Sequence, residues 1–405
     1  MSPNSPKDAA ALPPARITSI DALRGFVMFM MIFVNDLAGA PNKIVPNWMV
    51  HFSDRHHGGS GMTFVDLVFP AFLFIVGMSI PFALGSRLNR GEPLGKIVFH
   101  VVTRTPALLT LGILMVNGES SDDTWYRLML LSGIFAFCVV LPRNAGQGAQ
   151  KVWKIVSLVL RLAGFAGLIY LAFTFPGKHP IITLSPLHIH ASWFGILGII
   201  GWAYLIAATT FLVFRGNRTA LLGCIALFLC FYPADQTGAF SHFWLANYVS
   251  LADTLGSHGA IAVAGVLLAS ILIAPDMTAL KSRLNFTLLF IAGFAAAALL
   301  LNGLYGISKN DATPSWCLWS CAVTAALWLG FYYCCDVRPV EVVAKPFSVA
   351  GQNVLLAYLI SEMLPSISGM VAVNLTSAVA GSALCATLLL LAAARLNRIG
   401  FRLKL

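Results

Sequence analysis

The sequence predicts an all-α, polytopic integral membrane protein, and two observations predict it: the composition and the spacing of the apolar stretches. Apolar residues make up 58% of the 405 positions and charged residues only 10%, whereas soluble domains carry about 25% charged residues. The mean hydropathy is +0.81. Because apolar stretches recur along the whole length, separated by short polar loops, a soluble enzyme is not expected.

About twelve membrane-spanning helices are expected from these stretches. A helix needs about 17 to 25 predominantly apolar residues to cross the hydrocarbon. The seventh stretch is short, so eleven spans are the alternative. The expected spans lie near residues 20–40, 62–85, 97–116, 125–142, 153–175, 192–214, 219–233, 258–275, 285–305, 316–334, 347–366 and 372–394.

Basic residues gather in alternate connecting segments, and this pattern sets orientation in a membrane. It predicts that both termini are cytosolic and that the intervening loops, such as 41–61 and 306–315, face outward. The net charge of +10 then reflects topology, and no nucleic-acid partner is expected. The cytosolic set comprises Lys7, Arg16, Arg87, Arg90, Lys96, Arg143, Lys151, Lys154, Arg215, Arg218, Lys281, Arg283, Arg338, Lys345, Arg395, Arg398, Arg402 and Lys404.

One transmembrane domain over residues 17–405 accounts for nearly the whole chain. Residues 1–16 are polar and rich in proline and alanine, so they are predicted to be a disordered cytosolic tail and not a signal peptide. The eight cysteines fall within or at the ends of apolar segments without a CxxC pair. They are therefore predicted to be packing residues, with no disulfide framework or zinc knuckle.

Polar residues within the first two spans are candidates for function, because a charge inside a membrane is costly unless it is paired or faces water. Asp21 and Arg24 stand three apart at the start of the first span, on one helical face. Asn35 lies near the outer end of that span, and Asp66 lies early in the second. The alternative for Asp21 and Arg24 is a structural ion pair at the interface.

A second polar group occurs late in the chain. Asn353, Tyr358 and Glu362 fall in one expected span, and Tyr358 and Glu362 are four apart, so they share a helical face. This predicts an interior polar cluster, with a packing hydrogen bond between spans as the alternative. Arg104 and Arg161 either join such a site or extend to the cytosolic headgroups.

Four motifs carry a resemblance to a known family. Residues 19–25 read SIDALRG, residues 63–77 read TFVDLVFPAFLFIVG, residues 193–204 read WFGILGIIGWAY, and residues 351–358 read GQNVLLAY. The first two closely resemble the opening of the heparan-alpha-glucosaminide N-acetyltransferase family and its bacterial relatives, within the transmembrane acyltransferase superfamily. The later two are similar to weaker signatures of the bacterial members.

The resemblance implies one acyltransferase domain that takes acetyl from cytosolic acetyl-CoA and delivers it to an extracytoplasmic amino sugar or other glycan. In the family the catalytic residue is a histidine ten residues before the aspartate of the DLVFP motif, which is His56 here, followed by His57. Relatives carry a tryptophan three positions after that histidine, where this chain has Gly59. The acceptor, and which of the two histidines acts, therefore stay open.

Acyl transfer also asks for such a residue on chemical grounds. A base must remove the proton of the nucleophile, and an unperturbed imidazole titrates at about pH 6.5. His56 is predicted to be this base, or to carry the acetyl group itself as a covalent intermediate. Asn35 is predicted to hydrogen-bond the thioester carbonyl or the imidazole, and Asp66 to orient the imidazole.

The phosphates of CoA call for basic side chains on the cytosolic side. Arg24, Arg87, Arg90 and Arg104 are the candidates near the first motifs, each with the alternative of a residue that only sets topology. No phosphate-binding glycine loop is present, so a channel between helices is expected to hold the co-substrate. No metal is expected, since the outward histidines lack a fixed ligand spacing.

A secondary transporter is the main rival function, because twelve spans with cytosolic termini are common in transporters. Transporters usually show internal repeats, and we find no repeat between the halves of this chain. A scaffold protein of the cell envelope is a further alternative. The resemblance to bacterial members implies the bacterial inner membrane as the location, and a homodimer is compatible with it.

Overall fold

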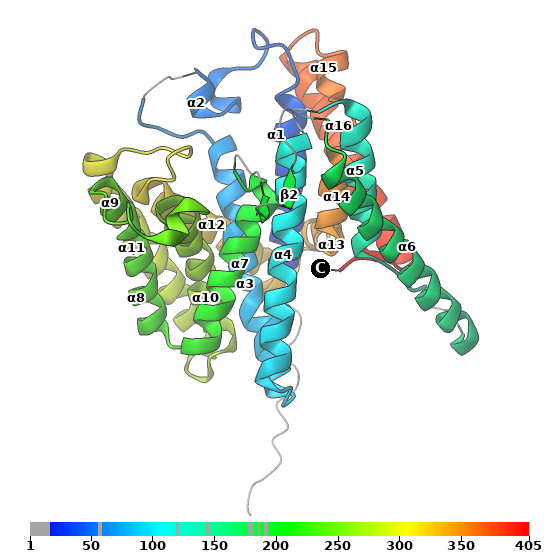
Figure 1. The fold of residues 1–405 in the computed structure, drawn as a ribbon. Helices are drawn as coiled ribbons and strands as arrows, with labels where there is room; N and C mark the ends of the chain where they lie inside the picture. The colour runs from blue at the N-terminus through cyan, green and yellow to red at the C-terminus, as the bar shows by residue number, and fades with distance from the viewer. Residues whose placement is uncertain are drawn as a thin grey trace, which may run out of the picture.

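The computed structural model of the protein describes residues 17–55, 59–118, 121–142, 146–176, 181–184, 187–189 and 193–404. The described chain is almost wholly helical (Figure 1), which confirms the predicted all-α class. Two small antiparallel pairs of strands accompany the helices: β1 (Cys138–Val140) with β4 (Phe401–Leu403), and β2 (Ile182–Leu184) with β3 (Leu187–Ile189).

The helices follow one another in the colour order of Figure 1, and short 3-10 or π-helical turns labelled η lie between some of them. They are α1 (Thr18–Leu37), η1 (Asn47–Met49), α2 (Phe52–Arg55), α3 (Val65–Asn89), α4 (Leu94–Gly118), α5 (Asp123–Phe137), α6 (Gln147–Phe173), α7 (Gly195–Phe214), α8 (Arg218–Leu229), α9 (Phe231–Gln236), η2 (Trp244–Asn247), η3 (Leu251–Ser257), α10 (His258–Ile273), η4 (Pro275–Met277), α11 (Leu280–Tyr305), α12 (Pro314–Tyr332), η5 (Tyr333–Val337), α13 (Glu341–Ala350), α14 (Val354–Ser361), α15 (Ile367–Val371) and α16 (Leu375–Arg398).

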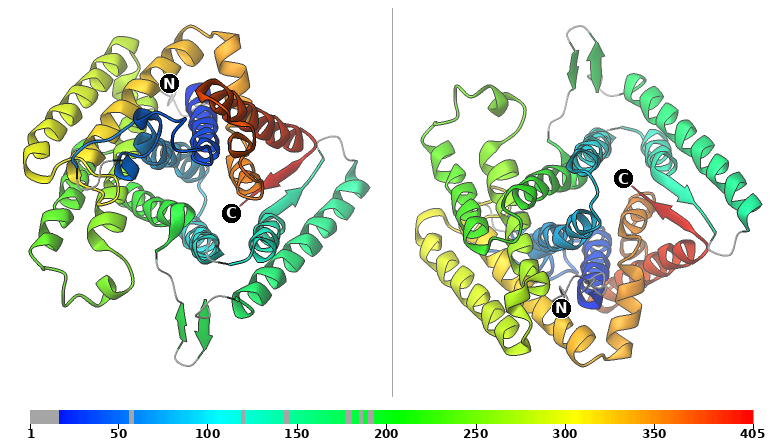
Figure 2. Two further views of the ribbon diagram at one scale, coloured as in Figure 1. Left: turned by 90° about the horizontal axis from the view of Figure 1, so that it is seen from above. Right: turned by 90° about the horizontal axis from the view of Figure 1, so that it is seen from below.

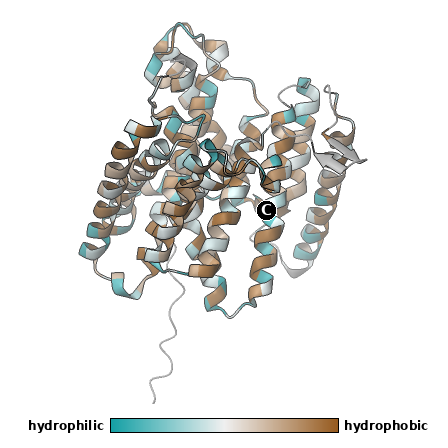
Figure 3. Cartoon of the chain, turned by 60° about the vertical axis from the view of Figure 1, so that its left-hand side comes forward, coloured by the Kyte–Doolittle hydropathy of each residue, from teal (hydrophilic) through white to brown (hydrophobic). Residues whose placement is uncertain are grey.

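Nine helical stretches among the described residues are long and apolar enough to cross a membrane. They identify an integral membrane protein. Hydrophobic residues cover much of these helices, and hydrophilic residues gather toward helix ends and connecting segments (Figure 3). The short seventh expected span is among the nine, because α8 and α9 together form an apolar stretch over Arg218–Gln236.

Three expected spans are not among the nine, so the predicted count of twelve is not shown. Helix α1 has 20 residues but carries Asp21, Arg24 and Asp36. Helix α5 has only 15 residues, which at about 1.5 Å per residue is short of the roughly 30 Å hydrocarbon. The expected span 347–366 is not continuous, because the chain breaks at residues 351–353 between α13 and α14.

Helix α10 is a central helix of the fold and packs against α3, α7, α8 and α12. Its span, Leu251–Ile273, is the most buried of the nine, at 89%. Helices α3 and α10 approach closely because each presents a glycine to the other: a Cβ at Gly77 would overlap the carbonyl of Ala262, and one at Gly265 would overlap the carbonyl of Phe74. Small residues allow such close approach in membrane helices, where packing replaces the hydrophobic effect.

The α5–α6 hairpin lies at the edge of the molecule in both views of Figure 2. Helix α6 packs mainly against α5 and β1, and only 28% of its span is buried. Strand β4 pairs with β1, placing Arg402 opposite Val139. This pairing joins the C-terminal strand to the segment that connects α5 to α6.

Replacement of Gly265 by alanine is expected to destabilise the protein, because the added methyl group has no space against the Phe74 carbonyl. We expect a loss of about 1–3 kcal/mol, visible as a lower melting temperature of the purified protein in detergent. Gly330→Ala in α12 is the matched control, since nothing lies within 4 Å of a Cβ there. Equal melting temperatures for the two variants would contradict the proposed close packing.

Candidate functional site

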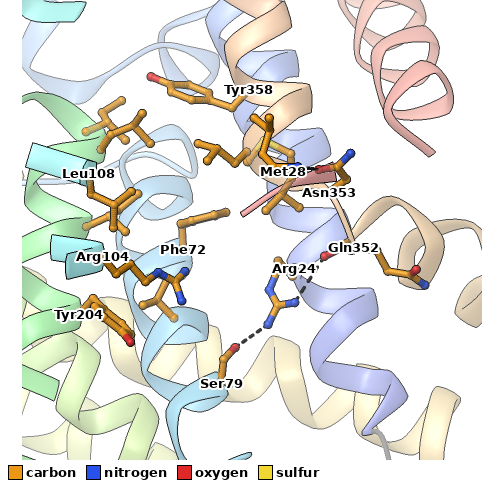
Figure 4. Close-up of a pocket in the computed structure, with 18 of the residues that line it drawn as sticks. Arg24, Met28, Phe72, Ser79, Arg104, Leu108, Tyr204, Gln352, Asn353 and Tyr358 are labelled. Atoms are coloured by element: carbon orange, nitrogen blue, oxygen red, sulfur yellow. Dashed lines mark hydrogen bonds between the residues drawn. The ribbon is translucent and has the colours of Figure 1, made fainter. Parts of the chain in front are cut away.

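A cavity of about 320 Å³ lies between α1, α3, α4, α7 and the segment after α13. We call it the central cavity (Figure 4). Apolar side chains form most of its walls, and the polar ones come from helices that are far apart in sequence. Its lining includes Arg24, Met28, Met31, Phe72, Ser79, Arg104, Leu108, Tyr204, Gln352, Asn353, Tyr358 and Leu403.

Arg24 forms one wall of the central cavity and links three elements. Its Nη1 donates to Asp21 Oδ1 at 3.0 Å, so the predicted i,i+3 pair is present. Nη1 also lies 3.4 Å from the carbonyl oxygen of Gly351, and Nη2 donates to Ser79 Oγ at 2.5 Å (Figure 4). The guanidinium group is therefore held in place by α1, α3 and the break after α13.

Arg104 extends from α4 into the central cavity from the opposite wall, and its guanidinium group points toward that of Arg24 (Figure 4). The guanidinium carbon lies 4.6 Å from the centre of the Tyr204 ring, a cation–π contact. The Nε atom is buried and has no hydrogen-bond partner among the described residues. A guanidinium whose buried Nε has no partner among the described residues suits an anionic ligand.

The break between α13 and α14 supplies polar groups to the central cavity. Asn353 is anchored to the C-terminal strand, because its Nδ2 donates to the Phe401 carbonyl at 3.2 Å and its Oδ1 accepts from Leu403 N at 3.3 Å. Gln352 Oε1 accepts from Asn397 Nδ2 at 2.9 Å. Irregular backbone at membrane depth is tolerated where it lines a cavity, which fits this position.

Sequence reasoning missed three polar residues of the central cavity: Ser79, Tyr204 and Gln352. Tyr204 and Gln352 belong to the motifs at residues 193–204 and 351–358, which is a signal that could have found them. Ser79 is one of two serines in the apolar helix α3. From the sequence alone it resembles a serine that bonds only its own helix. Only the packing of α1 against α3 shows that it also binds Arg24.

Another polar group joins α1, α5 and the end of α14. Asn35 Nδ2 donates to Glu362 Oε1, and Tyr126 Oη donates to Glu362 Oε2, both at 3.4 Å. Asn35 and Glu362 each lie one helical turn beyond a cavity-lining residue, Met31 and Tyr358 respectively. Of the predicted cluster, Asn353 and Tyr358 line the cavity, whereas Glu362 lies one helical turn beyond Tyr358.

Asp66 lies apart from the central cavity and is almost fully buried, at 1% exposed. Its Oδ1 bonds His51 Nδ1 at 2.7 Å, and its Oδ2 accepts from the backbone amides of Phe52 at 3.1 Å and Thr63 at 2.9 Å. The Nζ atom of Lys309 lies 3.3 Å from His51 Nε2. Asp66 therefore fixes both sides of the loop between α1 and α3.

The other predicted site residues do not take part in the contacts described above. His56 and His57 fall outside the described residues. Arg87 and Arg90 lie in and just after the last turn of α3 and do not line the central cavity, and Arg90 pairs with Glu92 at 3.2 Å. Among the residues that the structure describes, no group of three or more histidine, cysteine or acidic side chains could hold a metal ion.

Two larger cavities have fewer polar side chains in their walls. One of about 770 Å³ lies between α8 and α11, and one of about 490 Å³ lies between α4 and α6, where Arg161 lines it. Apart from an arginine and a few hydroxyl groups, their walls are apolar. The spans of α8, α11 and α6 are mostly unburied, so these hollows face the bilayer.

Comparison with known families assigns the first part of the chain. Residues 16–179 match the family model described as "Domain of unknown function (DUF5009)". The matched segment covers less than half of the chain. It contains α1, α3 and α4, and hence Arg24, Asn35, Asp66 and Arg104, whereas Tyr204 and the break before α14 lie beyond it.

The chain is also partly similar to a named membrane enzyme. It is 35% identical over 108 residues to human heparan-alpha-glucosaminide N-acetyltransferase and 33% identical over 102 residues to the mouse protein. These matches cover 27% and 25% of this chain. They span only 15% and 14% of the relatives' own lengths.

Replacement of Asp66 by asparagine is expected to loosen the loop between α1 and α3. The part-buried amides of Phe52 and Thr63 lose a charged acceptor, at a cost of about 1–3 kcal/mol. Hydrogen exchange at these two amides should accelerate by roughly 5- to 150-fold, which is this cost converted to a ratio. Asp123→Asn is the control, because that side chain is 92% exposed. Unchanged exchange in the Asp66 variant would refute the anchoring role.

Proposed function

We propose that the protein is a membrane-embedded acyltransferase that moves an acetyl group from cytosolic acetyl-CoA to an extracytoplasmic amino sugar or glycan. The partial similarity to heparan-alpha-glucosaminide N-acetyltransferase carries this proposal. The central cavity supports it, because two arginines and mostly apolar side chains line one space between the helices. The membrane in this proposal is the bacterial inner membrane.

The central cavity suits the acyl-pantetheine arm of acetyl-CoA. Its volume of about 320 Å³ is at the low end of the roughly 300–1,000 Å³ typical of small-molecule pockets. The adenine nucleotide then stays at the cytosolic mouth, within reach of basic residues that do not line the cavity, such as Arg87 and Arg90. Arg24 and Arg104 bind the phosphates, and Arg104 Nε gains the partner that it lacks among the described residues.

The transfer itself needs a base near the outer end of the acyl-pantetheine arm. The acceptor nitrogen, or a hydroxyl oxygen, attacks the thioester carbonyl carbon, a new bond forms to that carbon, and the C–S bond breaks. His56 takes the proton that the nucleophile loses and passes it to the departing CoA thiolate. Alternatively, His56 first accepts the acetyl group. His57 is the candidate if the register differs by one.

Asn35 and Asp66 support this chemistry in different ways. Asn35 lies one helical turn beyond Met31, which lines the central cavity, and in this proposal its amide donates to the thioester carbonyl. Asp66 bonds His51 and the Phe52 amide. In this proposal it positions the loop that carries His56, and it is not itself in contact with substrate.

A secondary transporter remains the second candidate, and the interrupted α13–α14 segment favours it. Discontinuous helices beside a central site are frequent in transporters. The two functions differ in their use of acetyl-CoA. A transporter would carry its solute without binding acetyl-CoA or releasing CoA.

Acetyl-CoA binding should depend on the two cavity arginines. Arg24→Gln and Arg104→Gln each remove a charged donor from the central cavity, so we expect affinity to fall by about 10- to 100-fold. Calorimetric titration of the purified protein would measure this. Arg127→Gln is the control, because this arginine is 53% exposed and pairs loosely with Asp123 at 3.6 Å. Equal affinities for all three variants would exclude the cavity as the CoA site.

Turnover should depend on one of the two adjacent histidines. We expect acetyl-CoA-dependent release of CoA, with a panel of amino sugars, to fall by at least 100-fold in His56→Ala and to persist in His57→Ala. The reverse result would assign the role to His57. If the wild type neither binds acetyl-CoA nor releases CoA, the acyltransferase proposal fails and the transporter function takes its place.

A further inference from the structure

The hollow of about 770 Å³ between α8 and α11 is a groove with a floor and two walls. We call it the lateral groove. Buried residues of α10 and α12, such as Leu267 and Leu318, form the floor. The walls are α8 and α11, at the edge of the molecule away from the α5–α6 hairpin (Figure 2). Only 11% of the Arg218–Gln236 span and 22% of the Leu280–Tyr305 span are buried, so membrane lipid lies beside the groove.

Aromatic rings connect the two walls at both ends of the lateral groove. At one end, the guanidinium carbon of Arg218 lies 5.8 Å from the centre of the Phe286 ring. At the other, the ring centres of Tyr232 and Tyr305 are 5.4 Å apart. Between these ends, Gly293 lines the groove, and a Cβ at this position would meet no described residue within 4 Å. The middle of the groove therefore has space for a chain that is not part of the protein.

Arg218 lies at the end of the lateral groove that the charge pattern predicts to be cytosolic. Its Nη2 donates to Asp276. Its Nη1 is buried and has no hydrogen-bond partner among the described residues. A buried guanidinium nitrogen beside an apolar groove is costly unless an acceptor binds it. The oxygen atoms of a phosphate group are acceptors that match a guanidinium.

Further positive charge gathers at the same end. Segments 215–219 and 274–283, which lead into α8 and α11, together hold four basic residues and one acidic residue, Asp276. Lys281 and Arg283 lie in the first turn of α11, and Arg215 lies three residues before Arg218. Basic sites between helices on the cytosolic side of a membrane bind anionic lipid headgroups. The excess charge therefore favours an anionic lipid over a zwitterionic one.

We propose that the lateral groove binds an anionic phospholipid of the membrane, with one acyl chain between α8 and α11 and the phosphate on Arg218. The acyl chain fills an apolar space that opens to the bilayer, and the phosphate supplies the acceptor that Nη1 lacks among the described residues. A second copy of the chain fits less well. Two-fold pairing of this face about the membrane normal would bring two sets of the same basic residues together. The lipid site does not depend on the proposed acyltransferase function.

The headgroup contact is tested by lipid binding to the full chain in detergent. Native mass spectrometry with phosphatidylglycerol and phosphatidylcholine should show that the wild type prefers the anionic lipid by about tenfold or more. We expect Arg218→Gln to weaken phosphatidylglycerol binding by about 10- to 100-fold, because a charged donor is lost. Asp276→Asn is the matched control. It breaks the same ion pair but keeps the guanidinium, so phosphatidylglycerol should bind at least as tightly as in the wild type.

The acyl-chain contact is tested with two glycines of α11. Gly293→Trp places a large side chain in the middle of the lateral groove, and we expect it to weaken binding of both phospholipids by about tenfold or more. Gly303→Trp is the matched control, because a Cβ there also meets no described residue within 4 Å but Gly303 does not line the groove. Melting temperatures equal to that of the wild type would establish that each variant is folded.

The results together decide the proposal. Weaker phosphatidylglycerol binding in Arg218→Gln and Gly293→Trp, with both controls unchanged, supports it. Equal affinity of the wild type for the two lipids overturns it, as does unchanged binding in either test variant. Equal loss in Arg218→Gln and Asp276→Asn also overturns it, because the broken ion pair would then account for the loss. A wild-type dimer that Gly293→Trp separates without loss of phosphatidylglycerol would assign the groove to a second copy of the chain.

Discussion

The arrangement of the site depends on how closely α1 can approach the α13–α14 segment. Gly25 on α1 and Gly351 at the end of α13 face each other, and a Cβ on either would overlap the backbone of the opposite helix. Within a bilayer, such close packing and the hydrogen bonds that accompany it are the main attractive forces between helices. The crossing brings the Gly351 carbonyl within 3.4 Å of Arg24, so the same contact that joins the helices also directs a charged side chain into the central cavity.

Polar side chains that are energetically costly inside a membrane form hydrogen bonds around the central cavity. Arg24 is satisfied by Asp21 and Ser79, and the Asn353 side chain bonds the backbone of the C-terminal strand. Arg104 stacks on Tyr204 but keeps one nitrogen without a partner among the described residues. Charge held in this unfinished state inside a membrane is expensive. In the proposed function, the anionic co-substrate supplies this partner.

Two buried carboxylates, one near the end of α1 and one near the start of α3, bind backbone amides of neighbouring segments. Asp36 fastens the end of α1 to α15, and Asp66 fastens the loop between α1 and α3. These bonds fix the end of α1 and the start of α3, two helices that line the central cavity, whereas neither carboxylate lines the cavity itself.

The sequence by itself determined the class of protein, because apolar length and charge alternation reflect the bilayer directly and need no knowledge of neighbours. It also determined the Asp21–Arg24 pair, which depends only on helical spacing. The tertiary structure alone decided which polar residues share one cavity, since Ser79, Tyr204 and Gln352 meet Arg24 and Arg104 across five separate segments. It likewise decided that one apolar stretch is interrupted, at Gly351–Asn353: hydropathy measures what the bilayer accepts, whereas the break is made by contacts with α1 and the C-terminal strand.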